Sequence, residues 1–94
     1  MSITYQKVPL TTAYQDSGPT VIQAPYRLQK ITIFVYGSAF MQIISEPHLG
    51  FPQVGLDEIT LAPGQNSKTW PNGIYGARFR GGTPTSLIDI EIVA

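Results

Sequence analysis

The chain has 94 residues, with six Lys or Arg balanced by six Asp or Glu and a single His. This length suits one small domain, and a net charge of zero argues against a dedicated nucleic-acid binder, which normally has a basic excess. The absence of Cys excludes a disulfide framework, a Cys-ligated zinc and a thiol nucleophile.

Pro and Gly recur so often that a helix of ordinary length has little room. The chain has nine Gly and eight Pro, and no window of a dozen residues after Ser45 escapes them. Period-two alternation is frequent instead, most clearly where Ile88, Ile90 and Ile92 interleave with polar residues. These patterns predict an all-β chain, with strands at 3–8, 20–23, 31–36, 59–62, 75–80 and 88–93.

Turn chemistry adds the connections between these strands. Gly37-Ser38 suits a two-residue hairpin, and Pro63-Gly64 suits the centre of a type II turn. The spacing predicts about seven or eight strands in a small antiparallel β-sandwich, similar to a jelly roll. Segment 31–36 is apolar on both faces, so we expect its outer face to be covered as well.

The first 26 residues differ in composition from the rest. They are rich in Thr, Gln, Ser, Tyr and Pro, and only Lys7 and Asp16 are charged. We therefore expect an N-terminal arm at 1–26, with short strands, and a β-sandwich domain at 27–94. Such an arm is ordered either by a neighbouring chain, which we favour, or by adding an edge strand to its own sheet.

The last two expected strands contain the clearest charge pattern. If Arg80 lies opposite Leu87, then Arg78 faces Asp89 on the solvent side of the sheet. The same register directs Phe79 into the core opposite Ile88. We predict a structural ion pair between Arg78 and Asp89. With Phe79 on the opposite face from the arginines, a nucleic-acid-binding surface is disfavoured.

No group of residues has the pattern of a catalytic site. His48, the only histidine, has Glu46 two residues away but no nucleophile beside it, and its simpler interpretation is an exposed loop side chain. The clustered acids are Asp57-Glu58 and Asp89/Glu91, and no spacing selects a metal site formed by His48 with Asp57 or Glu58. We expect no enzyme activity, no cofactor and no metal.

Aromatic side chains are the candidates for binding. Trp70 beside Pro71 is interpreted as a half-buried lid or an interface anchor, and Tyr5, Tyr14 and Tyr26 as further interface residues. An alternative is a sugar-stacking platform formed by Trp70 with four tyrosines, Tyr5, Tyr26, Tyr36 and Tyr75.

Targeting signals are not evident. The first residues lack the apolar region of a secretory signal, and the longest apolar stretches fall far short of the roughly 20 residues that span a bilayer. We expect a soluble protein made in the cytoplasm, with no membrane partner.

The second half resembles small β-sandwich proteins and modules of tailed-phage virions. The similarity lies in a strand, a Pro63-Gly64 turn, a polar strand, and then the run Asn72-Gly73-Ile74-Tyr75-Gly76-Ala77-Arg78-Phe79-Arg80 before a Gly-containing loop and the last strand. It covers roughly residues 27–94. Members of this group serve as capsid decoration (cement) proteins, head-fibre bases and tail accessory domains.

The resemblance implies a virion structural protein, and a capsid decoration protein is the expected function. Such a protein bridges major capsid subunits on the capsid surface and associates with other copies of itself, here expected as a homotrimer. A head-fibre or tail accessory protein is one alternative. A carbohydrate-binding module for host attachment is another.

Overall fold

The computed structural model describes residues 2–46, 50–53 and 55–93, and the side chains of these except at 2, 3 and 23–26. They form strands and connecting segments without a helix, which confirms the all-β prediction. Accordingly, no helix capable of crossing a membrane occurs in the described part of the chain. The strands are β1 (Ser2–Pro9), β2 (Val21–Tyr36), β3 (Ala39–Ile44), β4 (Ile59–Leu61), β5 (Gly64–Gly81) and β6 (Leu87–Val93).

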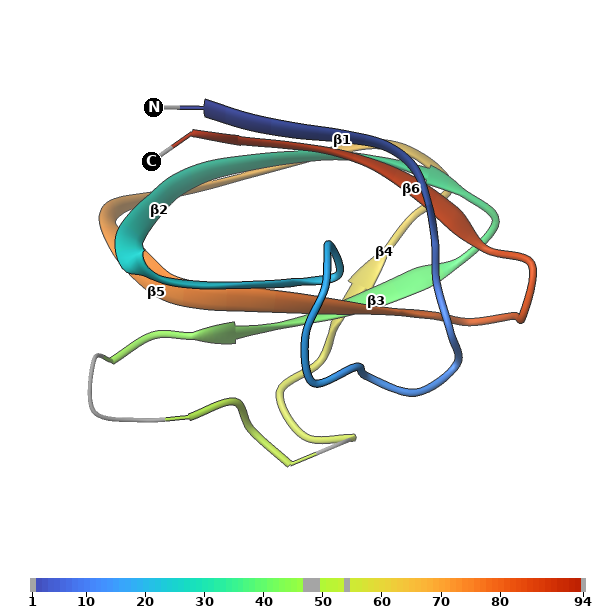
Figure 1. Ribbon diagram of the computed structural model, residues 1–94, viewed down its shortest axis with the longest axis horizontal. Helices are drawn as coiled ribbons and strands as arrows, with labels where there is room; N and C mark the ends of the chain where they lie inside the picture. The colour runs from blue at the N-terminus through green and yellow to red at the C-terminus, as the bar shows by residue number, and fades with distance from the viewer. Residues whose placement is uncertain (1, 47–49, 54, 94) are drawn as a thin grey trace.

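All six strands belong to one antiparallel sheet, in the order β1-β6-β2-β5-β3-β4. The long strands β2 and β5 turn back on themselves together, so that the sheet folds over and its two halves face each other (Figure 1). Residues 30–35 of β2 pair with 64–69 of β5 in the upper half, whereas 21–23 pair with 76–78 in the lower half. The described residues form six strands, against the seven or eight expected, because β2 and β5 each serve both halves.

The sheet bends back on itself where the hydrogen-bond ladder between β2 and β5 is irregular. The β2–β5 register shifts between Gln23 and Lys30, a stretch that contains Pro25, which has no N–H to donate. Across from it, Gly73 of β5 has a φ of 78°, and a Cβ there would come within 3.2 Å of the Arg27 side chain. Arg27 donates a hydrogen bond to the backbone carbonyl of Asn72. A residue with a side chain at position 73 would strain this corner.

Both glycines of the predicted turns have a positive φ, but the links that contain them connect the two halves of the sheet. Gly37 and Gly64 have φ values of 106° and 96°, as those turns require. However, β2 and β3 are not neighbours in the sheet, and neither are β4 and β5. The predicted hairpin at Gly37-Ser38 is thus wrong, because this link passes from the upper half to the lower half.

The core lies between the two facing halves. Alternate residues of β2 and β6 point inward and pair across the strands, with Ile31 opposite Ile92 and Ile33 opposite Ile90. They pack with Phe79 of the lower half, and each of these side chains is at most 1 % exposed. The predicted inward orientation of Phe79 and of the C-terminal isoleucines is confirmed. The other buried core members include Leu28, Val35, Ala39, Met41, Leu61, Ala77 and Ile88.

The predicted division into an arm and a domain does not match the structure. Its boundary at residue 26 falls inside β2. Strand β1 pairs with β6 from Ser2 opposite Val93 to Pro9 opposite Leu87, so it is an edge strand of the same sheet. The alternative interpretation, in which 3–8 adds a strand to its own sheet, describes the structure. All the described strands, β1 included, therefore belong to one sheet.

The predicted pairing of Arg78 with Asp89 is also wrong. Strand β6 lies between β1 and β2, while the Arg78 end of β5 lies between β3 and the start of β2. Local alternation gave the correct face for each side chain, but it does not specify which strands are neighbours. That depends on the fold in β2 and β5, which brings residues distant in sequence together.

A further difference concerns the outer face of 31–36. The side chain of Phe34 lies on this face and is 41 % exposed. The covering surface expected from its apolar character is thus not supplied by the described residues.

We predict that the two phenylalanines differ sharply in their contribution to stability. Phe79→Ala leaves a cavity between the sheet halves and should lower the free energy of unfolding by about 3–5 kcal/mol. Phe34→Ala removes an exposed ring and should lower it by less than about 1 kcal/mol. Urea unfolding followed by tryptophan fluorescence measures both values. Equal losses would contradict this assignment of inner and outer faces.

Candidate functional site

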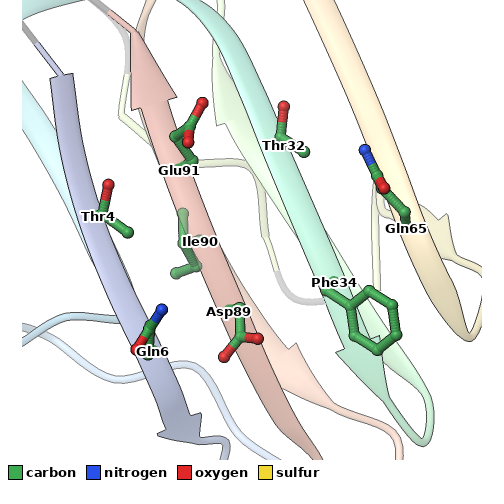
Figure 2. Close-up of a pocket in the computed structure, with 8 residues that line it drawn as sticks. All are labelled: Thr4, Gln6, Thr32, Phe34, Gln65, Asp89, Ile90 and Glu91. Atoms are coloured by element: carbon green, nitrogen blue, oxygen red, sulfur yellow. The ribbon is translucent and has the colours of Figure 1, made fainter.

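A shallow hollow lies on the outer face of the upper half, across β1, β6, β2 and β5 (Figure 2). Its volume is about 260 Å³. Most of the side chains that line it carry hydroxyl, amide or carboxylate groups, and one is aromatic. The lining residues are Thr4, Gln6, Thr32, Phe34, Gln65, Asp89, Ile90 and Glu91.

Strand register explains how these side chains meet. Glu91 lies opposite both Thr4 and Thr32, which forms one row across three strands. Phe34 lies opposite both Asp89 and Gln65, which forms the next row. Because outward residues alternate with the buried isoleucines, the packing of the core also determines which side chains face the hollow.

The aromatic side of the hollow is held by several contacts. The rings of Phe34 and Tyr36 have centroids 4.8 Å apart with an interplanar angle of 52°. The Tyr36 hydroxyl donates to Asp89 Oδ2 at 2.7 Å, and Lys7 Nζ lies 3.7 Å from the Tyr36 ring centroid. The Tyr36 ring is thus held from two sides, and it supports Phe34.

A β-bulge in β1 completes this arrangement. The β1–β6 register shifts between Tyr5 and Val8, and Lys7 has a φ of 52°. In this conformation the Lys7 backbone N–H donates to Asp89 Oδ1 at 2.7 Å. This bond and the one from Tyr36 lower the pKa of Asp89, while the contact with Tyr36 raises the pKa of Lys7. Asp89 is therefore a carboxylate with both oxygens already engaged.

The two arginines of β5 lie on the outer face of the lower half and are engaged within the protein. Arg80 donates to both carboxylate oxygens of Glu58, at 2.6 and 2.9 Å, and Tyr14 donates to the same carboxylate at 2.6 Å. Arg80 hydrogen bonds, and then the Tyr14 hydroxyl, lower the pKa of Glu58 to about 2. Burial and the neighbouring carboxylate raise the pKa of Tyr14. The three side chains join two loops.

Arg78 has a second set of partners. Its Nε donates to Oε1 of the buried Gln42 at 2.8 Å, and its Nη2 donates to the Pro52 carbonyl at 2.9 Å. The guanidinium carbon lies 4.3 Å from the Tyr14 ring centroid and 4.7 Å from that of Phe51. Through these contacts Arg78 holds the segment around Pro52 against β3, so its role is structural.

Gln42 is the polar residue that the sequence interpretation missed. Its Nε2 donates to the carbonyls of Gln53 and Leu56, both at 2.9 Å, so the whole amide is satisfied despite complete burial. A lone amide within the apolar run 39–44 was the available signal. Phe34 was missed as a surface residue because its apolar character favoured a covered position.

The predicted interface residues lie in different environments. Tyr5 is an exposed side chain on the edge strand, whereas Tyr14 is bound to Glu58 and Trp70 is partly buried against the core. The side chain of Tyr26, and His48 as a whole, lie outside the described part of the structure. An interface role for Trp70, Tyr5, Tyr14 and Tyr26 remains a prediction.

The hollow offers hydrogen bonding and ring stacking. Glu91, Thr4, Thr32 and Gln65 have no side-chain partner among the described residues, so their polar groups are available to a ligand. No group of three or more possible metal-ligating side chains occurs in the described part of the chain.

Comparison with protein-family models, with curated proteins and with solved structures found no match to this chain.

We predict that Glu58 makes the fold sensitive to acid. Its pKa is about 2 in the folded chain against 4.5 for an ordinary glutamate, so the stabilisation is complete above pH 4.5 and disappears as the pH falls toward 2. Glu58→Gln should lower the melting temperature at pH 7 and flatten its decline between pH 4.5 and 2. Asp16→Asn, an exposed change, should leave the wild-type profile intact. An unchanged pH profile in Glu58→Gln would show that the Arg80 contact contributes nothing to stability.

Proposed function

We propose that this chain is a structural protein of a tailed-phage virion, a capsid decoration protein that binds neighbouring proteins through the free edge of β1. The observation that carries the proposal is that β1 ends the sheet and pairs only with β6 among the described strands. An unpaired edge presents backbone donors and acceptors to which a strand of another chain can add.

The β1 edge has a regularly paired part, followed by a part in which a bulge and a lysine limit the pairing of further strands. Ser2 to Tyr5 pair in regular register with β6, and the bulge and the charge of Lys7 follow. A bulge and a lysine are features that limit indiscriminate edge pairing. They therefore favour a short, defined docking segment at residues 2–5 over continuous aggregation along the strand.

An adjacent hollow would add side-chain contacts. It lies between β1 and the following loop, has a volume of about 540 Å³ and is lined mainly by apolar groups. Tyr5, which is 39 % exposed, forms part of it with Pro9 and Pro19. A strand added at the edge would place alternate side chains toward such a hollow, which supports a specific protein partner.

Charge pairing within the chain is consistent with this function. Lys7, Arg78 and Arg80 each contact residues of their own chain, so the described surface has few free cations to attract nucleic acid.

In the proposed mechanism, each copy bridges capsid subunits, and many weak contacts together stabilise the shell. The major capsid protein and further copies of this chain, in a homotrimer, are the proposed partners. A head-fibre or tail accessory protein could use the same edge.

The proposal predicts that charging the edge blocks decoration. Tyr5→Lys should reduce co-sedimentation with shells of the source virus that lack this protein by at least about tenfold, since an interface aromatic can contribute about 2 kcal/mol or more. Leu56→Lys changes another exposed apolar residue far from the edge and serves as the matched control.

Both variants should retain the wild-type melting temperature within a few degrees, because both side chains are exposed. Normal decoration by folded Tyr5→Lys would reject the edge as the docking site. Failure of the wild-type protein to bind shells would reject the proposed function.

A further inference from the structure

From the hollow shown in Figure 2 we infer a second binding site, for a single ring of a neutral sugar, built on Phe34. This site lies on the open face of the upper half and shares only Gln6 with the hollow beside the β1 edge. The proposed docking segment at 2–5 contributes Thr4 alone to its lining, so variants at Phe34 and at Tyr5 test the two sites separately.

Phe34 has the properties of a stacking platform. Its ring projects from the middle of the sheet, is 41 % exposed, and presents its face outward in Figure 2. The Tyr36 ring, itself held by Asp89 and Lys7, supports it from the side. A preorganised ring of this kind loses little conformational freedom when an apolar ligand face packs against it. The C–H face of a sugar ring is such a surface.

The surrounding groups supply the complementary hydrogen bonds. Glu91 and Thr32 lie in the row next to Phe34, and Gln65 lies beside the ring on β5. A carboxylate accepts hydrogen bonds, while amide and hydroxyl groups both donate and accept, which matches the mixed character of sugar hydroxyls. These side chains are without intramolecular partners in the described structure, unlike Asp89, Gln42 and the β5 arginines.

Charge and size narrow the ligand class. Two carboxylates, Asp89 and Glu91, face the hollow and disfavour phosphates, sulfates and acidic sugars. A divalent cation is disfavoured as well, because Asp89 already accepts two hydrogen bonds and leaves Glu91 as one carboxylate. The volume of about 260 Å³ lies below the roughly 300–1,000 Å³ of pockets for drug-sized ligands, which suits one sugar ring.

The test is a titration followed by amide chemical shifts in NMR spectra. The probes are the methyl glycosides of glucose, galactose, mannose and N-acetylglucosamine, each added to the wild-type chain. We expect at least one of them to shift amides of β2 and β6 around Phe34, Ile90 and Glu91. Phe34→Ala should weaken that binding by at least about tenfold, and Glu91→Gln should weaken it as well. Tyr5→Ala and Asp16→Asn, which alter an aromatic and an acid outside the hollow, should bind as the wild type does.

The variants must retain the dispersed amide spectrum of a folded chain, and Phe34 and Glu91 are exposed enough for this to be expected. The inference is overturned if none of the four glycosides perturbs this face, or if Phe34→Ala binds as tightly as the wild type. It is also overturned if Phe34→Ala abolishes shell binding without any sugar binding, since the face would then be a protein interface. Sugar binding retained in Tyr5→Lys would separate this site from the proposed edge contact.

Discussion

The structure depends on the joint turning of β2 and β5, which folds a single sheet over its own apolar face. Without that turn, the inner faces of β2 and β6 would have no opposing layer, and Ile31, Ile33 and Ile90 would be exposed on one side. Because a sheet of this size must bury one face to be stable, the corner around Pro25 and Gly73 matters as much as the isoleucines themselves.

The same turn determines where the surfaces lie. It places the Phe34 face on one outer side, and the arginine face on the other, where segments around Tyr14 and Pro52 cover it. The covered face has a satisfied network, with the buried Gln42 amide at its centre. Among the described residues, the open face has polar side chains without intramolecular partners around the exposed ring of Phe34. The two outer faces of this small chain thus differ, since one is covered and internally hydrogen bonded and the other is open.

Alternation in the sequence correctly predicted which side chains point inward. Phe79 and Ile88 are buried as expected, and Arg78 and Asp89 are on outer faces, because the strand period depends only on local geometry. Neighbour relations were predicted less well. The prediction that the last two strands form a hairpin is wrong, because β6 lies between β1 and β2. Short sequence patterns do not specify such long-range strand pairing.

The candidate site shows the same limit. Thr32, Phe34, Asp89 and Glu91 were each recognisable as one face of a strand, but their meeting in one hollow required the pairing of β6 with β2. The ion pair of Arg80 with Glu58 could not be predicted from local patterns either, because the two residues are 22 positions apart in the chain. Tyr14 was expected at an interface because it is aromatic, whereas its hydroxyl is used within the chain.

We propose that one edge of this folded sheet binds protein while its open face remains available to a ligand. A cryo-electron microscopy map of a particle that carries the chain would test this most directly. We expect β1 in contact with a neighbouring subunit and the face around Phe34 turned toward solvent. A map in which β1 is free and Phe34 is packed against the shell would contradict it.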